Sequence, residues 1–268
     1  MKTTVIVAAH KEYPMPTDPL YLPVQAGRAL HAPLAYTGDD TGENISEKNR
    51  SFCELTCLYW AWKNLDADAV GLCHYRRYLA GKGAAGTNPF GDLKTGDKAF
   101  DRKASRILTA REAKDLLREA PVLLPKKRDY FIETGYSQYV HAHHEEDLTV
   151  TREILSERCP DYVEAFDRTL AQTKGHRFNM FVMRRDLLDR YCGWLFDILF
   201  ELENRLDISA YSDYDKRVFG FVAERLLDVW LETRRTPYRN VPYVFLENQN
   251  WWTKGMNFIK RKLKAKQS

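Results

Sequence analysis

The segment Ala69-Val70-Gly71-Leu72-Cys73-His74-Tyr75-Arg76-Arg77-Tyr78 decides the fold class, because an apolar run leads directly into a histidine, two arginines and two tyrosines. A short run of small and β-branched residues bounded by polar ones is typical of a buried central strand. Open α/β sheets bind ligands at the carboxyl ends of such strands. Guanidinium groups match phosphate oxygens, and an imidazole can donate a hydrogen bond or carry charge. We expect His74, Tyr75, Arg76 and Arg77 to bind a phosphate-bearing ligand, although solvated arginines at a strand end would give the same pattern.

The composition favours one domain built around a sizeable core. The chain has 268 residues, of which 44% are hydrophobic and 13% aromatic. Its formal net charge of +4 is small and spread along the chain, whereas nucleic-acid-binding proteins concentrate basic residues on one face. We therefore expect a small anionic ligand or a membrane surface as the partner, and no nucleic acid.

Cysteine usage and hydropathy favour a cytoplasmic location. The chain has 5 cysteines, and most lie among apolar residues, which indicates reduced, buried thiols. The apolar run near residue 5 has no small-residue cleavage site, so we interpret it as a strand rather than a signal peptide. No stretch approaches the roughly 20 apolar residues of a membrane span.

The first part of the chain predicts a strand followed by a proline-rich loop. Thr3 to Ala9 is β-branched and apolar, and His10 follows it directly, as in the first parallel strand of a nucleotide-binding sheet. We expect His10 either to contact the ligand or to lie in a loop. Prolines 14, 16, 19 and 23 predict an irregular loop that carries Tyr21 and Gln25 across the surface.

The next stretch predicts a turn and a buried helix. Residues 38 to 44 combine Gly, Asp and Asn, which favour turns, and Asp39 and Asp40 there could also bind a ribose or a metal. Ser51 and Glu54 have the spacing of a capping box, which would begin a helix that continues to residue 64. Lys48 and Asn49 precede this helix, where free amides and the helix dipole favour an anion.

Several further elements follow from simple patterns. Residues 81 to 101 predict a loop of the kind that covers active sites, and disorder fits equally well. We expect helices over 109–119, 186–206 and 218–231, and short strands over 121–125 and 176–183. The basic run Lys126-Lys127-Arg128 predicts a solvated patch.

Two polar features interrupt the second half of the chain. The constellation around residues 136–147 places His141 and His144 three apart, which on a helix gives them one face that Asp147 continues. Metal binding and a polar wall around a sugar hydroxyl explain it equally well. Glu224 lies in an apolar helix, where burial would raise its proton affinity as a general base requires; an ion pair with an arginine is the alternative.

The end of the chain combines aromatic and basic residues. Trp251 and Trp252 are followed by the run Lys260-Arg261-Lys262-Leu263-Lys264-Ala265-Lys266. This pattern fits an anchor on anionic lipid at the inner face of the cell membrane. A solvated terminus explains it as well.

Four stretches, taken together, resemble one family: 39–49 (DDTGENISEKN), 54–64 (ELTCLYWAWKN), 71–78 (GLCHYRRY) and 217–227 (RVFGFVAERLL). The chain resembles the bacterial capsular and exopolysaccharide glycosyltransferases annotated only as a domain of unknown function, number 4422. Some relatives resemble galactofuranosyltransferases. The resemblance covers nearly the full length, and it implies an α/β, GT-A-like, Rossmann-related sheet flanked by helices, in a single domain with a helical C-terminal part.

The resemblance also implies which parts of the chain bind the donor and which bind the acceptor. Residues 1–250 would form the glycosyltransferase domain, with a nucleotide-sugar-binding part over 1–130 and a helical acceptor side over 131–250. Residues 251–268 would form an aromatic and basic tail. The expected donor-binding residues are His10, Asp40, Asn44, Lys48, Asn49, His74, Tyr75, Arg76 and Arg77. The expected acceptor-binding residues are Gln138, Tyr139, His141, His144, Asp147, His176, Asn179 and Arg217.

The implied reaction moves a sugar from a UDP-sugar to a growing capsular, exopolysaccharide or O-antigen glycan, or to a polyprenyl-diphosphate-linked acceptor. A GT-A enzyme usually holds the donor diphosphate with an Asp-x-Asp motif and a divalent cation. Here 74–77 takes that place, so we favour fixed cations and no cofactor, with a divalent cation as the alternative. If the reaction inverts, the candidate bases are Glu224, Asp215 and Asp213, in that order. A non-catalytic nucleotide-sugar-binding or glycan-binding subunit is the alternative.

Overall fold

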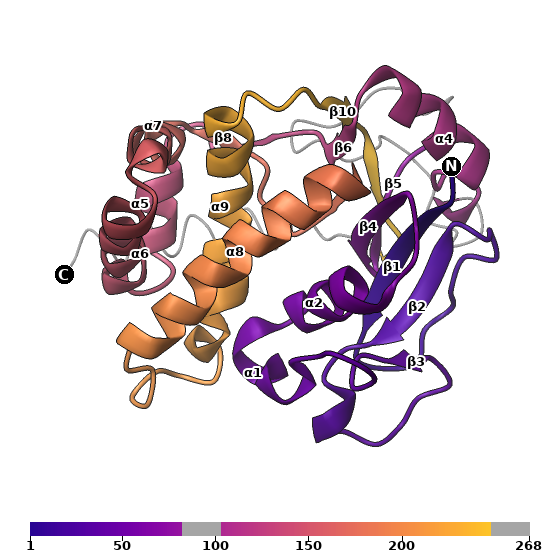
Figure 1. The fold of residues 1–268 in the computed structure, drawn as a ribbon, viewed down its shortest axis with the longest axis horizontal. Coiled ribbons are helices and arrows are strands. Elements are labelled where there is room, and N and C mark those ends of the chain that lie inside the picture. The colour runs from indigo at the N-terminus through magenta and orange to yellow at the C-terminus, as the bar shows by residue number, and fades with distance from the viewer. Residues whose placement is uncertain (82–102, 248–268) are drawn as a thin grey trace.

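The first predicted strand, β1 (Thr3–Ala9), lies within a 9-stranded sheet in the computed structural model, which describes residues 1–81 and 103–247 (Figure 1). The order of the main path is β10-β6-β9-β4-β1-β2-β3, and β5 and β11 extend from β4. The other strands are β2 (Tyr21–Gln25), β3 (Thr37–Gly38), β4 (Ala69–His74), β5 (Arg77–Leu79), β6 (Val122–Pro125), β9 (Phe181–Arg184), β10 (Arg239–Val241) and β11 (Tyr243–Phe245).

The topology brings two strand ends together. β1 pairs in parallel with β2 and β4, and Ala8 is in register with His74, so both β1 and β4 end at one edge of the sheet. β4 then reverses through a two-residue turn into β5, which places His74 opposite Arg77. β9 runs antiparallel between β4 and β6. The chain after residue 131 therefore supplies three strands to the sheet as well as helices.

Alternate side chains of the strands pack into two apolar cores, one on each face of the sheet. Ile6 and Ala8 of β1 lie in the core shared with α2 (Leu55–Asn64), α8 (Arg185–Arg205) and α9 (Val218–Thr233). Val5 and Val7 lie in the second core, with α4 (Ala110–Glu119) and β11. Both faces of the sheet are thus covered, as the apolar composition of β1 and β4 requires.

The remaining helices enlarge the first core. They are α1 (Asn49–Phe52), α5 (Gly135–Val140), α6 (Glu145–Arg158) and α7 (Val163–Ala171). In Figure 1, α5, α6 and α7 lie beyond α8 and α9 as seen from the sheet. A short ladder joins β7 (Arg128–Asp129) to β8 (Lys174–Gly175). These elements confirm the predicted fold class, an α/β sheet flanked by helices with a helical C-terminal part.

Most of the predicted elements are present. β1, β4, β6, α4, α8 and α9 lie where the sequence patterns put them, and α4 begins with a capping box between Thr109 and Glu112. None of the helices within residues 1–81 and 103–247 is long and apolar enough to cross a membrane. The predicted tail over 251–268 lies outside the described residues, as does the predicted loop over 81–101 apart from Gly81.

The predicted surface loop through Tyr21 and Gln25 is wrong. These residues begin and end β2, and both are buried, at 9% and 1% exposure. Tyr21 donates a hydrogen bond to the carbonyl of Leu108 over 2.7 Å. Pro23 is tolerated because β3 pairs only with Val24 and Gln25, so the strand edge beside Pro23 needs no amide donor.

The predicted capping box at Ser51 and Glu54 is also wrong. The helix is interrupted between α1 and α2 at Cys53, whose φ is 51°. The Ser51 hydroxyl bonds instead to the carbonyl of Lys48. Glu54 makes no capping bond, and its carboxylate is free to accept from Asn179. The interruption therefore leaves the Glu54 carboxylate available to Asn179, which lies just before β9.

Candidate active site

The carboxyl ends of β1 and β4 collect aromatic and imidazole rings. The His10 and His74 ring centroids are 6.4 Å apart, and the His74 ring lies 4.4 Å from the Tyr75 ring. His10 meets Tyr75 edge to face at 5.3 Å. The Lys11 ammonium lies 5.6 Å from the centre of the Tyr75 ring. Three of the residues predicted to bind the donor are therefore neighbours at this edge.

The two histidines at this edge are neutral at physiological pH. Burial, followed by the charges of Arg77 and Arg76, lowers the pKa of His74 to about 3. Burial also lowers the pKa of His10, with Arg76 as the next cause. The imidazoles can therefore exchange hydrogen bonds with a ligand, but the positive charge must come from other side chains.

The adjacent arginines Arg76 and Arg77 have different surroundings. Arg76 is ion-paired with Glu247 at 3.3 Å. Arg77 contacts two aromatic rings, with its Cζ 3.6 Å from the Phe178 centroid and 4.6 Å from that of Phe245. Burial lowers the pKa of Arg77 to about 10, so it remains charged at neutral pH. Arg77 thus keeps a charge that no ion pair in the described chain neutralises.

Glu224 of α9 lies in the same electrostatic neighbourhood. Its carboxylate accepts a hydrogen bond from Arg225 at 2.8 Å, and Arg225 also donates to Gln138 at 2.7 Å. Burial raises the pKa of Glu224, while Arg225, Arg77 and Arg128 oppose the shift. The Glu224 side chain is still 23% exposed. It is thus a desolvated carboxylate that a ligand can reach.

Side chains from the segments just before α2, β9 and α9 complete this neighbourhood. The Asn179 amide donates to Glu54 at 2.9 Å and to the carbonyl of Gly220 at 3.0 Å. Arg217 donates to Cys53 at 3.3 Å and is close enough to lower the pKa of both His10 and His74. Asn179 and Arg217, predicted for the acceptor, therefore lie near the predicted donor residues.

Sequence reasoning missed four members of this site. Glu54 was interpreted as a helix cap, and Arg128 as part of a solvated patch, while Arg177 and Arg225 were not selected. Arg128 is half-buried, with its Cζ 5.4 Å from the Phe178 centroid. Arg177 and Arg225 are each 4% exposed. Of these four residues, only Arg225 carried a sequence signal, because it is a charge within an apolar helix.

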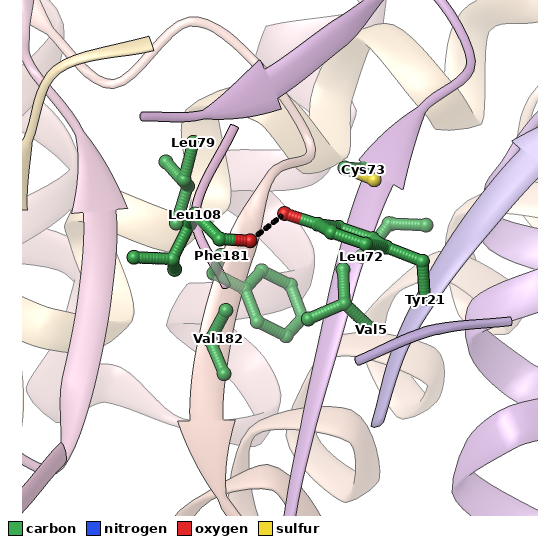
Figure 2. A pocket seen from close by; sticks show the side chains of 8 residues that line it. All are labelled: Val5, Tyr21, Leu72, Cys73, Leu79, Leu108, Phe181 and Val182. Atoms are coloured by element: carbon green, nitrogen blue, oxygen red, sulfur yellow. Dashed lines mark hydrogen bonds between the residues drawn. The ribbon is translucent and has the colours of Figure 1, made fainter. Parts of the chain in front are cut away.

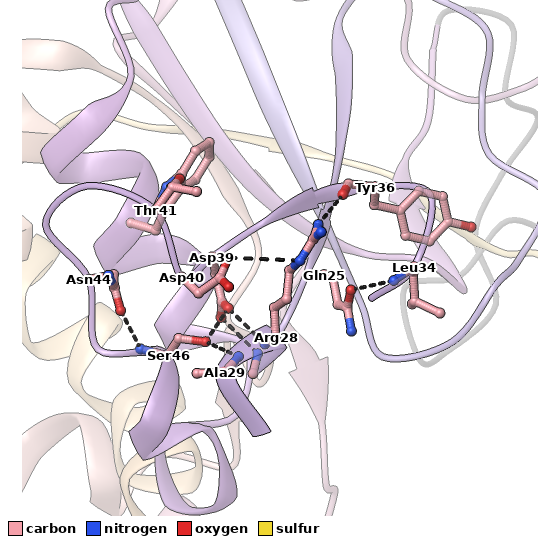
Figure 3. Close-up of polar contacts among 12 residues, drawn as sticks. Gln25, Arg28, Ala29, Leu34, Tyr36, Asp39, Asp40, Thr41, Asn44 and Ser46 are labelled. Atoms are coloured by element: carbon pink, nitrogen blue, oxygen red, sulfur yellow. Dashed lines mark hydrogen bonds and ion pairs between the residues drawn. The ribbon is translucent and has the colours of Figure 1, made fainter. Parts of the chain in front are cut away.

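The other predicted donor residues already have protein partners, and Figure 3 shows two of them, Asp40 and Asn44. Asp40 lies 3.9 Å from Arg28, and Asn44 accepts from the amide of Ser46. Lys48 is ion-paired with Glu203 of α8 at 2.7 Å. The fourth residue, Asn49, donates to the carbonyl of Cys53 and to Thr56. A donor role for these four residues remains a prediction.

Asp39, beside Asp40, anchors this turn region. It is fully buried, and its carboxylate accepts hydrogen bonds from the amides of Gly27 and Arg28 and from the hydroxyls of Ser46 and Thr56. With so many donors the charge is satisfied within the protein. Asp39 therefore fixes the loop between β3 and α1 and leaves little capacity for a ligand.

The predicted shared helix face of His141, His144 and Asp147 is wrong. His141 follows the end of α5, and His144 precedes the start of α6, so the two histidines lie in the connection between two separate helices. His141 contacts Glu133 at 2.9 Å, and the ring of His144 stacks on Tyr211 at 3.9 Å. The pattern failed because three-residue spacing gives one face only within a continuous helix.

Two buried carboxylates hold other predicted acceptor residues in the core. Asp147 accepts from Tyr139 at 2.7 Å and from Tyr211 at 2.8 Å. His176, which is fully buried, contacts Asp228 through Nδ1 and Asn240 through Nε2. Tyr139, Asp147 and His176 therefore have their polar atoms occupied by protein partners.

The two other candidate bases differ from Glu224. Asp215 contacts His143 at 3.3 Å and accepts from Ser212 at 2.6 Å, and these bonds lower its pKa. Asp213 is exposed. His143, which was not selected from the sequence, stacks on Phe221 at 4.2 Å, and Phe221 in turn lies under Arg217.

Two cavities in the described part of the chain are lined by residues other than those predicted for the site. A void of about 10 Å³ lies between Tyr21, Cys73, Leu108 and other apolar side chains (Figure 2), and it is too small for more than about one water molecule. A depression of about 260 Å³ lies between α8 and the end of α9. Within the described ranges, no three His, Cys, Asp or Glu side chains form a group suited to a metal ion.

The sheet, its flanking helices and the polar residues gathered at the ends of β1 and β4 define a single α/β domain. The chain belongs to the family described as "Domain of unknown function (DUF4422)", whose model matches residues 4–235. It is similar to the solved apo structure of the bifunctional glycosyltransferase WbbM, with a TM-score of 0.83 and 29% sequence identity. The match covers 92% of this chain and 46% of the WbbM chain, so the protein spans about half of WbbM. No curated protein sequence matches.

Proposed function

We propose that the protein transfers a sugar from a nucleotide-sugar donor to a glycan. The observation that carries this proposal is the position of Glu224, a desolvated but accessible carboxylate in the field of Arg77, Arg128 and Arg225. The likeness to WbbM, described as a bifunctional glycosyltransferase, supports the same class of reaction. This arrangement combines a proton acceptor with cations for an anionic leaving group.

The proposed donor is a UDP-sugar, with galactofuranose or another hexose as the transferred group. Its phosphates would meet the cationic side chains near the ends of β1 and β4, with His10, His74 and Tyr75 offering rings and hydrogen bonds. Fixed guanidinium groups can stabilise the charge that develops on the departing diphosphate. We therefore propose that transfer proceeds without a divalent cation.

Glu224 is the proposed general base. An acceptor hydroxyl oxygen would attack the anomeric carbon, the bond from that carbon to the phosphate oxygen would break, and the hydroxyl proton would pass to the Glu224 carboxylate. Burial raises the proton affinity of this carboxylate, whereas hydrogen bonds lower the pKa of Asp215. This contrast supports placing Glu224 ahead of Asp215 as the candidate base.

The proposed acceptor is a growing capsular, exopolysaccharide or O-antigen glycan, or a polyprenyl-diphosphate-linked sugar. Gln138, Asn179 and Arg217 border the Glu224 neighbourhood and are the proposed acceptor contacts. A lipid-linked acceptor would be consistent with a cytoplasmic protein at the inner face of the membrane. That location is part of the proposal.

A panel of nucleotide sugars, assayed for binding and then for hydrolysis or transfer, tests the proposal. We expect one UDP-sugar to bind and turn over, with activity retained in EDTA. Binding without turnover of any donor would instead favour a non-catalytic subunit. Complete loss of activity in EDTA that manganese restores would contradict the metal-independent part of the proposal.

A further inference from the structure

Three arginines beside Glu224 form a cluster without carboxylate partners, which we name the arginine cluster: Arg77, Arg128 and Arg177. Arg77 and Arg128 share Phe178, with Cζ atoms 3.6 and 5.4 Å from its centroid. Arg128 and Arg177 share Tyr130, with both Cζ atoms 5.7 Å from its centroid. These shared rings join side chains from β5, β7 and the segment after β8 into one group.

The cluster contains buried nitrogen atoms without hydrogen-bond partners. They are Nε of Arg77, Nε of Arg128, and Nε and Nη2 of Arg177. Within residues 1–81 and 103–247, none of the three guanidinium groups forms an ion pair. By contrast, Arg158 and Arg205 on the surface each bond to two carboxylates. Buried polar atoms are normally satisfied, so these four nitrogens indicate an anion that the protein binds.

The energetic cost supports the same conclusion. Removing a charge from water without a partner costs several kcal/mol, and an interior cation therefore needs a compensating group. Burial lowers the pKa of Arg177, and the charge of Arg225 lowers it further. Arg225 differs because it bonds to Glu224 at 2.8 Å. The uncompensated charge lies on the three members of the cluster.

Two glycines leave room for the Arg177 guanidinium. A Cβ atom at Gly175 would lie 2.6 Å from its Cζ, and one at Gly135 would lie 2.7 Å from its Nη2. The ladder between β7 and β8 pairs Gly175 with Arg128. The Arg177 guanidinium therefore packs closely against the backbone at both glycines, and the ladder brings Arg128 beside the same segment, as a preorganised anion site requires.

The charges of the predicted donor residues narrow the choice of anion. Arg76 is neutralised by Glu247, Lys48 is neutralised by Glu203, and His74 is uncharged. A nucleotide-sugar diphosphate carries one negative charge on each phosphate, and departure of the sugar adds another. The charge of the cluster therefore matches the departing nucleotide diphosphate more closely than the intact donor.

We propose that Arg77, Arg128 and Arg177 bind the diphosphate of the donor, with Arg128 and Arg177 as binding residues that the sequence did not reveal. The identity of the ligand rests on the proposed function, whereas the anion site rests on the unpaired guanidinium groups. Guanidinium groups bind phosphate oxygens through paired hydrogen bonds, so this arrangement stabilises the leaving group directly.

Calorimetric titration with inorganic pyrophosphate, UDP and uridine tests the assignment. We expect Arg128→Gln and Arg177→Gln each to weaken pyrophosphate and UDP binding by about tenfold or more, with uridine binding unchanged. Arg177→Lys, which keeps the charge but loses the planar fork, should weaken binding less than Arg177→Gln. Arg158→Gln removes one charge from an exposed arginine that bonds to two carboxylates, and it is the matched control.

Wild-type affinity in folded Arg128→Gln and Arg177→Gln would overturn the assignment, as would failure of the wild type to bind pyrophosphate. Where Arg177→Gln does not fold, Arg128→Gln gives the same test at a half-buried position. Pyrophosphate binding that depends on the cluster, together with no binding or turnover of any nucleotide sugar, would support the anion site and refute the proposed function.

Discussion

Arg225 holds Glu224 through a hydrogen bond of 2.8 Å while its second nitrogen reaches Gln138 at 2.7 Å. This contact connects the proposed base on α9 to the polar residues of α5. It also sets the balance between two opposing effects, because burial raises the pKa of Glu224 and Arg225 lowers it. The ion pair that the sequence offered as an alternative to a catalytic role is therefore compatible with that role.

Glu224→Gln should lower kcat by about 100-fold or more, because a general base typically contributes a factor of 10² to 10⁴. Donor affinity should change little, since the variant keeps the size of the side chain. Rapid-quench or coupled assays with the active UDP-sugar measure kcat, and titration with UDP measures binding. Glu153→Gln, at an exposed position on α6, is the control. Near-normal turnover in Glu224→Gln would transfer the role of base to another carboxylate.

Arg225→Met should move the acidic limb of the pH profile of kcat toward higher pH. Arg225 lowers the pKa of Glu224, so its removal raises that pKa, and a higher pH is needed to keep the base deprotonated. The profile of Arg225→Met is compared with that of wild type between pH 5 and 9. An unchanged acidic limb would mean that a group other than Glu224 titrates there.

His74 should make the fold sensitive to acid. Its folded-state pKa of about 3 lies below the ordinary value of 6.5, so its contribution to stability is complete above about pH 6.5 and is lost as the pH falls toward 3. Between pH 7 and pH 5 the wild type should lose about 2 kcal/mol of unfolding free energy that His74→Gln does not lose. Denaturant titrations at both pH values measure the difference, with exposed His31→Gln as the control. Equal losses in wild type and His74→Gln would contradict the expected titration.

His176→Ala should destabilise the protein rather than weaken acceptor binding directly. The change leaves the buried carboxylate of Asp228 without its imidazole partner, and breaking such a pair costs about 3 kcal/mol or more. Denaturant unfolding measures the loss. In protein that remains folded, KM for the acceptor should match that of wild type. A raised KM without a change in stability would instead restore the acceptor role that the sequence suggested.

Strong local patterns made much of the fold predictable. β1 and β4 are apolar runs that end in polar residues, and α8 and α9 carry wide apolar stripes. β2 was missed because its proline disfavours a strand, and the open edge that tolerates it depends on the length of β3. Local composition cannot reveal which edge of a strand lacks a partner.

The site was predictable only in part, for a similar reason. His10, His74 and Glu224 follow or interrupt apolar runs, so the sequence marked them. Arg128 lies in a basic run, and such runs are usually solvated. Its burial depends on pairing with β8, which begins 46 residues further along the sequence. Pairings between distant segments carry no local signal, and three-residue spacing misled us at His141 and His144 because the helix there is not continuous.

The two-residue turn between β4 and β5 has a consequence for how this site can vary. Since His74 pairs with Arg77 across the turn, the number of residues between them decides which arginine faces Phe178 and which one meets Glu247. Deleting Tyr75 would leave both arginines in the chain but would shift their register by one residue, which turns each side chain toward the opposite face. The number of residues in the turn, as much as their identity, therefore determines which face of the sheet each arginine side chain occupies.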